Sequence, residues 1–305
     1  MTETLVVVGD VINDIIVRPR GPMEFGTDTP SEIERSPGGS GANQAAWLAA
    51  LGASVRFVGR AGRSDAAFHR DALERLGVKA QVSPDDETAT GTIVVLVSAD
   101  GERSMFTDRG ANASLGPADM SAGLLDDAGL LHVSGYQFFE AATRAVVRGL
   151  WARALGAGLE TSVDPASVAG LREVGVGPFL EWTQGATFIF PNLDEGRLLT
   201  GCDEPDAITA ALLLSYPVVA LKLGPAGALV AAADGRRIQL DALPTNIVDS
   251  TGAGDAFCAG FLTSWAHGAE LESCALDAVT TAARAVGQVG ARPQENLRAP
   301  GSIVS

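Results

Sequence analysis

Residues 249–262, DSTGAGDAFCAGFL, combine the residue types that a phosphoryl transfer requires. Three small residues, Gly252, Ala253 and Gly254, precede a helical pattern, and small residues let the backbone N–H groups at a helix start approach an anion closely. Asp255 follows in the expected first turn, where its carboxylate can take a proton from a hydroxyl while the amides hold developing negative charge. The alternative is that Asp255 only supplies a favourable charge at a helix N-terminus.

Three other polar segments are candidates for ligand contact. Residues 36–43, SPGGSGAN, combine glycines that let backbone pass close to a ligand with Asn43, whose amide can donate and accept toward vicinal hydroxyls. Asp14 follows the first apolar run, and Asn192 and Glu195 have the spacing of a helix cap. Each of these also has a purely structural interpretation, as a tight turn, a solvated acid or a cap.

Apolar, β-branched runs alternate with longer helical patterns along the chain. Continuous apolar strands are typical of a parallel sheet that helices cover on both faces, so the pattern predicts an α/β fold. We expect strands at residues 5–8, 55–58, 130–133, 159–163, 187–190 and 218–221, and helices at residues 41–51, 66–76, 142–155, 195–199, 253–267 and 272–286. No linker or repeat interrupts the alternation, which favours a single domain over residues 1–305.

Two stretches, about 15–36 and 90–110, depart from this alternation. The first is rich in Pro, Gly and Thr, and the second contains TGTIVVLVSADGERSMFT, in which Asp100 and Gly101 suit the tight turn of a hairpin. We predict that the two stretches form a small β-sheet lid over a site on the main sheet; two solvent loops are the alternative. Neither face of the hairpin is polar, so a homodimer through the lid is a further hypothesis.

Composition excludes several classes of protein. Among 305 residues, 46% are hydrophobic, which excludes disorder, and the net charge of −15 argues against a nucleic-acid partner. The three cysteines form no C-x-x-C pair, so a disulfide framework or a zinc site is not indicated. The start lacks a basic signal region, and no apolar run approaches the roughly 18 residues of a membrane helix. We therefore expect a cytoplasmic protein without a membrane partner.

Residues 249–262 resemble the C-terminal signature D-T-x-G-A-G-D-x-F of the ribokinase-like carbohydrate kinases, the PfkB family, and residues 36–43 are similar to its N-terminal glycine-rich signature. The motifs follow the family's order from residue 6 to residue 294. The resemblance implies a three-layer α/β/α ribokinase-like fold with a mostly parallel central sheet and a small β-sheet lid. It also implies an ATP-dependent kinase for a hydroxyl, which we expect to be primary, of a free sugar or sugar derivative, with Mg²⁺ as cofactor and K⁺ as a further one.

The resemblance implies a role for each matching residue. Asp255 would act as the base, and the amides of Gly252, Ala253 and Gly254 would form the anion hole. The implied acceptor-binding residues are Asn13, Asp14, Gly38, Gly39, Ser40 and Asn43, and the implied nucleotide-binding residues are Asn192, Lys222, Gly224 and Gly227. Glu195 would act on Mg²⁺ through water, and Asp249, Thr251, Ala285 and Gly290 would hold a monovalent cation.

The chain departs from ribokinases proper at two acceptor contacts, which argues against ribose as the acceptor. Ser40 stands where those enzymes usually have Lys, and Gly135 stands where they have Glu. A nucleoside kinase and a 2-keto-3-deoxygluconate-type sugar acid kinase of the same family are the alternatives. A non-catalytic nucleotide or sugar sensor and a dinucleotide dehydrogenase are rivals from other classes, and the second lacks a G-x-G-x-x-G motif after the first strand.

Aromatic and basic residues near the expected site leave the acceptor open. Tyr136, Phe138 and Phe139 can wall a sugar or a base, or they can belong to the core. Arg103 and Arg109 flank the return of the lid, where an inward guanidinium would suit a carboxylate or phosphate on the substrate. Solvated arginines are the alternative.

Overall fold

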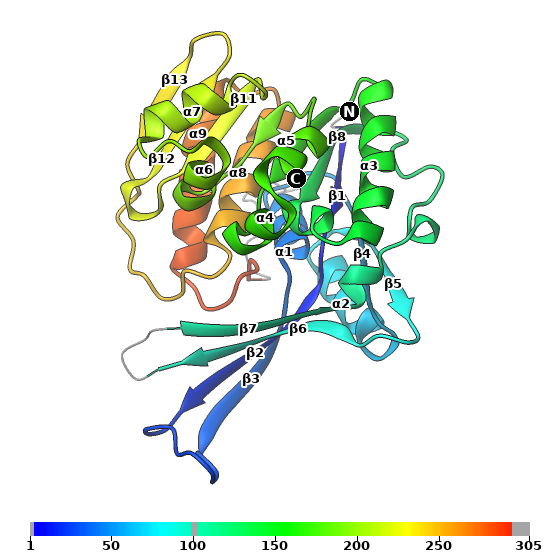
Figure 1. Ribbon diagram of the computed structural model, residues 1–305, viewed down its shortest axis with the longest axis vertical. Helices are drawn as coiled ribbons and strands as arrows, with labels where there is room; N and C mark the ends of the chain where they lie inside the picture. The colour runs from blue at the N-terminus through cyan, green and yellow to red at the C-terminus, as the bar shows by residue number, and fades with distance from the viewer. Residues whose placement is uncertain (1–2, 99–102, 295–305) are drawn as a thin grey trace, which may run out of the picture.

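The computed structural model describes residues 3–98 and 103–294, which form a large sheet covered by helices and a second, small sheet that projects from it (Figure 1). The strands are β1 (Thr4–Val8), β2 (Ile12–Pro19), β3 (Ser31–Gly38), β4 (Val55–Gly62), β5 (Lys79–Asp85), β6 (Thr90–Val97), β7 (Arg103–Gly110), β8 (Ala128–Ser134), β9 (Glu160–Asp164), β10 (Phe188–Ile189), β11 (Val218–Lys222), β12 (Ala228–Ala232) and β13 (Arg237–Leu240). The α-helices are α1 (Ser40–Ala50), α2 (Arg63–Arg75), α3 (Ala141–Gly156), α4 (Val168–Val174), α5 (Val176–Trp182), α6 (Leu193–Thr200), α7 (Pro205–Leu212), α8 (Ala253–Ala266) and α9 (Leu271–Val286). Short 3₁₀ helices are η1 (Ala111–Ser114), η2 (Pro117–Asp119), η3 (Gly135–Phe138) and η4 (Gly224–Ala226).

The large sheet has nine strands in the order β13-β12-β11-β10-β9-β8-β1-β4-β5. All pairings from β11 through β5 are parallel, and only β12 and β13 run antiparallel to their neighbours. The six strands expected from apolar runs all lie in this sheet. The predicted α/β fold with a mostly parallel central sheet is therefore confirmed.

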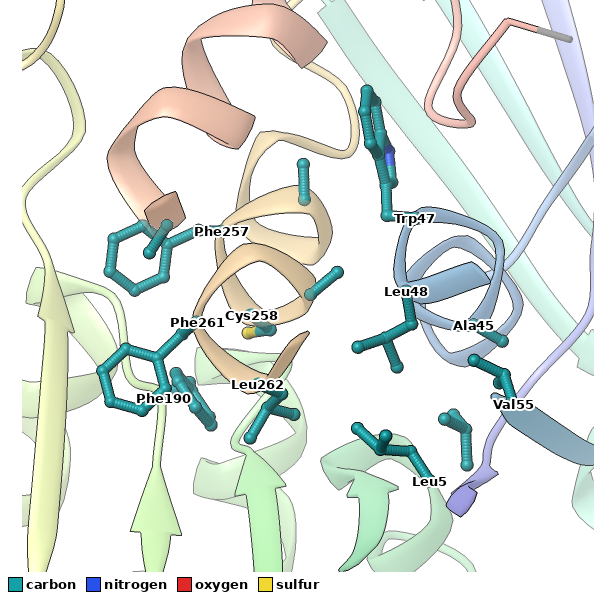
Figure 2. Packing of buried hydrophobic residues seen from close by; sticks show 14 of the residues in the cluster. Leu5, Ala45, Trp47, Leu48, Val55, Phe190, Phe257, Cys258, Phe261 and Leu262 are labelled. Carbon is teal, nitrogen blue, oxygen red and sulfur yellow. The ribbon is translucent and has the colours of Figure 1, made fainter. Parts of the chain in front are cut away.

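Helices cover both faces of the large sheet, as the apolar strands require. In β1, Leu5 and Val7 pack against α1, α8 and α9, whereas Val6 and Val8 pack on the opposite side with α3, α4, α5, α6 and α7. Because successive strand residues point to opposite faces, one five-residue strand contributes to both cores. Figure 2 shows the first core, where the apolar side chains of α1 and α8 meet over the sheet.

The small sheet consists of β3-β2-β6-β7, drawn from the two stretches that depart from the α/β alternation. The antiparallel pairs are β2 with β3 and β6 with β7, and β2 and β6 pair in parallel. The first segment forms its sheet from residue 12, three residues before the predicted start. The reading of these stretches as two solvent loops is wrong. The hairpin turn predicted at Asp100 and Gly101 lies outside the described residues.

The structure contains all six expected helices, but the sequence pattern did not predict the shorter helices α4, α5 and α7. The six expected helices correspond to α1, α2, α3, α6, α8 and α9. The helices α4 and α5 have seven residues each and meet at Gly175, whose positive φ of 87° ends one helix and begins the next. Two turns are too few to show a helical period, so the sequence pattern did not reveal them.

Within the described ranges, the helices are all too short or too polar to span a membrane. The three cysteines, Cys202, Cys258 and Cys274, are free thiols, and the last two are buried.

Candidate active site

The carboxyl ends of the parallel strands supply many polar residues of the site, because parallel strands end at the same edge of a sheet. Asp10 follows β1, Tyr136 follows β8 within η3, and Asp164 is the last residue of β9. Asn192 follows β10 and forms an isolated bridge with Lys222, the last residue of β11. Five segments distant in sequence therefore meet at one edge.

The predicted anion loop begins α8 as expected. Gly252 precedes the helix with φ 78°, and a Cβ there would lie 2.6 Å from the carbonyl oxygen of Ala291, so only glycine fits this position. No side chain caps the helix, and Ala253, Gly254 and Asp255 form its first turn. The first backbone N–H groups of a helix lack intrahelical partners, so this turn offers donors to an anion.

Two side chains from the first turn of α1 hold Asp255. Its Oδ1 accepts a hydrogen bond of 2.7 Å from Ser40 Oγ, and its Oδ2 accepts one of 3.1 Å from Asn43 Nδ2. Burial raises the pKa of the Asp255 carboxyl to about 7, although the bond from Ser40 lowers it. A carboxyl with this pKa can take up a proton near neutral pH, as a general base must.

Asp14 on β2 lies close to a guanidinium that the sequence motifs did not indicate. Burial raises the pKa of Asp14 to about 6, while Arg292 lowers it. Arg292 Nε donates to Asn43 Oδ1 at 3.2 Å, and its Nη2 donates to the Gly38 carbonyl at 2.9 Å. Burial lowers the pKa of Arg292 to about 10, against the effects of Asp14 and Asp255. The positive charge of Arg292 thus partly offsets the negative charges of Asp14 and Asp255.

A cavity of about 220 Å³ lies between this edge of the large sheet and the small sheet. Its polar lining consists of Asp10, Asp14, Arg18, Ser36, Ser40, Asn43, Thr107, Arg109, Tyr136, Asp249, Thr251 and Asp255, and backbone of Gly39, Gly252, Gly290 and Ala291 completes that wall. The apolar lining is Ile12, Ile16, Ile93, Val95, Val97 and Met105 from the small sheet. The cavity therefore has a carboxylate-rich floor and an apolar wall.

Lys222 and Asp164 form a buried ion pair beside the anion loop. Lys222 Nζ lies 2.9 Å from Asp164 Oδ2, with side-chain exposures of 14% and 6%. Burial alone would lower the pKa of Lys222, but Asp164, Cys258 and Glu195 together raise it. A Cβ built on Gly254 would lie 3.4 Å from Lys222 Nζ, which brings this ammonium under the first turn of α8.

Asn192 and Glu195 form a reciprocal cap at the start of α6. Asn192 Oδ1 accepts from the Glu195 backbone N–H, and Glu195 Oε2 accepts from the Asn192 N–H, both at 2.8 Å. Glu195 is buried, and burial together with the charge of Asp164 raises its pKa. The structural and the functional interpretation of these residues are compatible, because the cap itself fixes the Glu195 carboxylate near Asp164 and Lys222.

The residues expected to hold a monovalent cation lie only partly together. Asp249 Oδ1 accepts from Thr251 N at 2.8 Å, and Asp249 Oδ2 accepts from Gly290 N at 3.2 Å, so this carboxylate ties two loops at the cavity. Ala285 is buried in α9 and does not line the cavity. Across residues 3–98 and 103–294, no group of three or more His, Cys, Asp or Glu side chains is arranged to hold a metal ion.

Asn13, expected at the acceptor, does not line the cavity. Its Oδ1 accepts from Arg35 at 2.8 Å and lies 3.0 Å from His69 Nε2, and its Nδ2 donates to Asp65 at 3.0 Å. Asn13 and Asp14 are neighbours on a strand, so their side chains point to opposite faces, and only Asp14 faces the cavity.

The other expected residues fall into two groups. Gly39 lines the cavity, whereas Gly38 lies behind Asp14 and accepts a bond from Arg292. Gly224 and Gly227 flank the turn η4 between β11 and β12, away from the acceptor cavity. The expected acceptor and nucleotide residues therefore lie at separate places along the same sheet edge.

Comparison with known proteins decides the family. The family model described as pfkB family carbohydrate kinase matches residues 2–297. This chain belongs to the pfkB family. As a pfkB-family kinase it is an ATP-dependent transferase, which excludes the dehydrogenase alternative and confirms the family expected from the two glycine-rich signatures.

Three relatives of this pfkB-family kinase differ in the acceptor that their names state. A protein named ATP-dependent ribose-1-phosphate kinase from Halopiger xanaduensis is 29% identical over 97% of this chain and 96% of its own. The structure of Arabidopsis thaliana ribokinase complexed with ribose and ATP is 28% identical, with a TM-score of 0.79 over 97% of both chains. Adenosine kinase from Sinorhizobium meliloti is 25% identical, with a TM-score of 0.86 over 98% of both chains. The chain is a sugar or nucleoside kinase of the family.

The two departures from ribokinases proper have structural counterparts. A Cβ built on Gly135 would lie 2.5 Å from the Pro165 carbonyl oxygen, so no longer side chain fits there without backbone movement. Ser40, in place of Lys, donates its hydroxyl hydrogen to Asp255. The aromatic residues divide as well, because Tyr136 lines the cavity whereas Phe138 is fully buried in the core and Phe139 packs against it.

Proposed function

We propose that this pfkB-family kinase transfers the γ-phosphoryl group of ATP to a hydroxyl, expected to be primary, of a free sugar or sugar derivative in the cavity. The observation that carries the proposal is the placement of the Asp255 carboxylate in the cavity lining, within the first turn of α8. A base and a set of free amide donors thereby act on the same reacting group. In this proposal the whole chain is one kinase domain, and the small sheet is its lid.

In the proposed transfer, the γ-phosphoryl group passes from ATP to the acceptor hydroxyl. The acceptor hydroxyl oxygen forms a bond to Pγ, and the bond from Pγ to the β,γ-bridging oxygen breaks, so that ADP leaves with that electron pair. The hydroxyl proton passes to Asp255 and from there to solvent. The amides of Gly252, Ala253 and Gly254 stabilise negative charge on the transferred group. Asp14, Gly39 and Asn43 orient the acceptor, so its hydroxyl meets Asp255.

Nucleotide and Mg²⁺ binding is assigned to the other side of the same edge. Asn192, Lys222 and the turn containing Gly224 and Gly227 would bind ATP. The buried carboxylate of Glu195, next to Asp164, suits a hard cation that takes its other ligands from water and phosphate oxygens. When bound there, Mg²⁺ neutralises phosphate charge. We assign no step to K⁺, because both Asp249 oxygens already accept backbone N–H groups.

A nucleoside kinase is the second candidate, and the apolar wall of the cavity favours it. Ile16, Ile93, Val95, Val97 and Met105 present an apolar surface, which suits the flat face of a nucleobase better than the hydroxyls of a sugar. The adenosine kinase relative has the same fold over nearly its full length. A sugar acid kinase would need a cation to bind the carboxylate of its acceptor, and Arg109 lines the cavity.

Coupled ADP release with Mg-ATP tests the proposal against pentoses, hexoses, ketohexoses, sugar acids, sugar phosphates and nucleosides. Turnover of one sugar class supports it, and turnover of nucleosides alone favours the second candidate. Absence of turnover over the whole set, with ATP binding retained, would point to the non-catalytic sensor. Thermal shifts with each acceptor provide an independent measure of binding.

Ser40→Ala is expected to move the acid limb of the pH profile to higher pH. The Ser40 hydrogen bond lowers the pKa of Asp255, so its loss raises that pKa further above about 7. A hydrogen bond to a charged group corresponds to a shift of about one unit. Activity requires the ionised base, so kcat/KM should decrease as the pH falls below the pKa of Asp255. When kcat/KM is measured from pH 5 to 9, the midpoint of this decrease should lie at a higher pH in the variant than in the wild type. An unchanged midpoint would contradict Asp255 as the titrating base.

We also propose a homodimer through the outer face of the lid. The opposite face of the small sheet carries the apolar residues Val17, Ile33, Val94, Leu96 and Phe106, together with polar residues such as Arg35, Thr92 and Asp108. Ile33 and Phe106 are 67% and 63% exposed, which is unusual for large apolar side chains on a sheet. Light scattering should give the mass of a dimer, and Phe106→Asp should give a monomer. A wild-type monomer at micromolar concentration contradicts the dimer.

A further inference from the structure

Arg109 on β7 carries buried hydrogen-bond donors without partners inside the cavity. Its Nε and Nη2 atoms are shielded from solvent and have no hydrogen-bond partner among the described residues. The residue lines the cavity, and its guanidinium carbon lies 5.0 Å from the ring centroid of Tyr136, which also lines it. The aromatic ring therefore supports the guanidinium on one side while two N–H groups remain available.

A buried charged group without partners costs several kcal/mol, so most such donors in folded proteins are satisfied. Nε and a terminal Nη of one guanidinium form a planar fork whose two N–H groups match the two oxygens of a carboxylate or phosphate. A neutral hydroxyl can also accept from such a fork, but it carries no charge to offset that of the guanidinium. The pair of unpartnered atoms on Arg109 therefore suits an oxyanion better than a neutral sugar hydroxyl.

Two other cations near the cavity differ from Arg109. Arg18 lies 3.5 Å from Glu34 and is partly exposed. Arg292 donates to Asn43 and Gly38, and although its Nη1 has no hydrogen-bond partner among the described residues, Arg292 does not line the cavity. The cavity lining also holds Asp10, Asp14 and Asp255, which would repel an anion placed next to them. An anionic group is therefore expected beside Arg109, over Tyr136, rather than beside these carboxylates.

We propose that the acceptor is an anionic sugar, whose carboxylate or phosphate is bound by the Nε and Nη2 atoms of Arg109 while one of its hydroxyls meets Asp255. The inference rests on the proposed kinase function and specifies the substrate class. Different residues of one cavity then bind the oxyanion and the reacting hydroxyl. Because Arg109 belongs to the small sheet, the oxyanion also ties that sheet to the substrate.

The test compares matched anionic and neutral acceptors in the wild type and in Arg109→Gln. The pairs are D-gluconate with D-glucose, D-ribose 1-phosphate with D-ribose, and D-fructose 6-phosphate with D-fructose; the first pair reports a carboxylate and the others a phosphate. We expect the wild type to prefer one anionic member at least tenfold. Arg109→Gln should lower kcat/KM for that member about 100-fold, with the KM for ATP unchanged.

Two further variants separate this role from a structural one. Arg109→Lys keeps the charge without the fork and should recover part of the loss on the anionic acceptor. Arg144→Gln is the matched control, because Arg144 also lies over an aromatic ring, at 4.2 Å from the Trp182 centroid, but outside the cavity. It should leave the preference between paired acceptors unchanged. Circular dichroism establishes that each variant is folded.

A preference for the neutral members, or an unchanged preference in Arg109→Gln, overturns the inference and leaves the kinase proposal intact. If no acceptor is turned over, the kinase proposal fails. Anion binding then tests whether Arg109 binds an oxyanion. Inorganic phosphate and acetate should then raise the melting temperature of the wild type more than that of Arg109→Gln. Equal shifts in both proteins would overturn it.

Discussion

Asp255→Asn is expected to lower kcat by about 1,000-fold while raising the melting temperature. General-base catalysis contributes 10²- to 10⁴-fold, and an amide cannot take up the proton. Stability changes in the opposite direction because the folded state raises the pKa of Asp255 from 3.8 to about 7. The stability associated with the protonated carboxyl is fully present below pH 3.8 and is lost as the pH rises through 7. The uncharged amide avoids that loss.

Turnover and thermal melting measured at pH 5, 7 and 8.5 check this expectation. The asparagine side chain can accept from Asn43 and donate to Ser40, so both hydrogen bonds remain possible. The variant should melt about 3 °C or more above the wild type at pH 8.5, and the difference should shrink at pH 5.

Asp206→Asn is the matched control for Asp255→Asn, because Asp206 is also an acid in the first turn of a helix, is 69% exposed and lies outside the cavity. It should leave kcat unchanged and reduce stability slightly, since it removes only a helix-terminal charge and a surface ion pair with Arg237. Retained turnover in Asp255→Asn would show instead that Asp255, like Asp206, only supplies charge to a helix.

Lys222→Met is expected to destabilise the fold by about 3–5 kcal/mol, the usual consequence of removing one partner of a buried ion pair. The variant would leave the Asp164 carboxylate buried without its cation, next to the buried Glu195. Urea unfolding followed by circular dichroism measures the loss. Turnover should fall as well, since in the proposed site Lys222 lies beside the phosphates.

Two variants control for Lys222→Met. Lys79, the other lysine of the chain, is exposed on β5, and Lys79→Met should change stability by no more than about 0.5 kcal/mol. The double variant Lys222→Met with Asp164→Asn removes both charges and should regain part of the lost stability, but not the turnover. If Lys222→Met is as stable as the wild type, the ion pair does not hold this edge of the sheet together.

The fold was predictable because its signal is local and repeated. Each buried parallel strand is a continuous apolar run, and each long helix carries its own period, so the α/β pattern appears many times over. The small sheet was also predictable as extended chain, but the start of β2 was not, and this had a consequence for the site. Adjacent residues of a strand point to opposite faces. If the start of β2 had been predicted correctly, Asn13 and Asp14 would not both have been predicted to contact the acceptor.

The site was predictable only where residues form contiguous motifs. Asp255 and Asn43 lie in such motifs and line the cavity, and Glu195 lies in another, in the first turn of α6. Asp164 ends a short strand in TSVDPAS, and Arg292 follows the last helix, so neither stands out by spacing. Their importance depends on neighbours 58 and 249 residues away along the chain, which no local pattern encodes.

The contact between α1 and α8 has a consequence for folding. Ser40 and Asp255, which this contact joins by a hydrogen bond, are 215 residues apart, and the apolar side chains of both helices interlock in the same core (Figure 2). Closing so long a loop costs chain entropy, and contacts within the loop do not offset this cost. Contacts between residues far apart in sequence, such as those between α1 and α8, therefore form slowly. A ribosome-bound chain that ends before α8 can already hold most strands of the large sheet, yet it has no base. Enzymatic activity therefore shows that α8 has packed against α1, whereas the amount of β-structure does not.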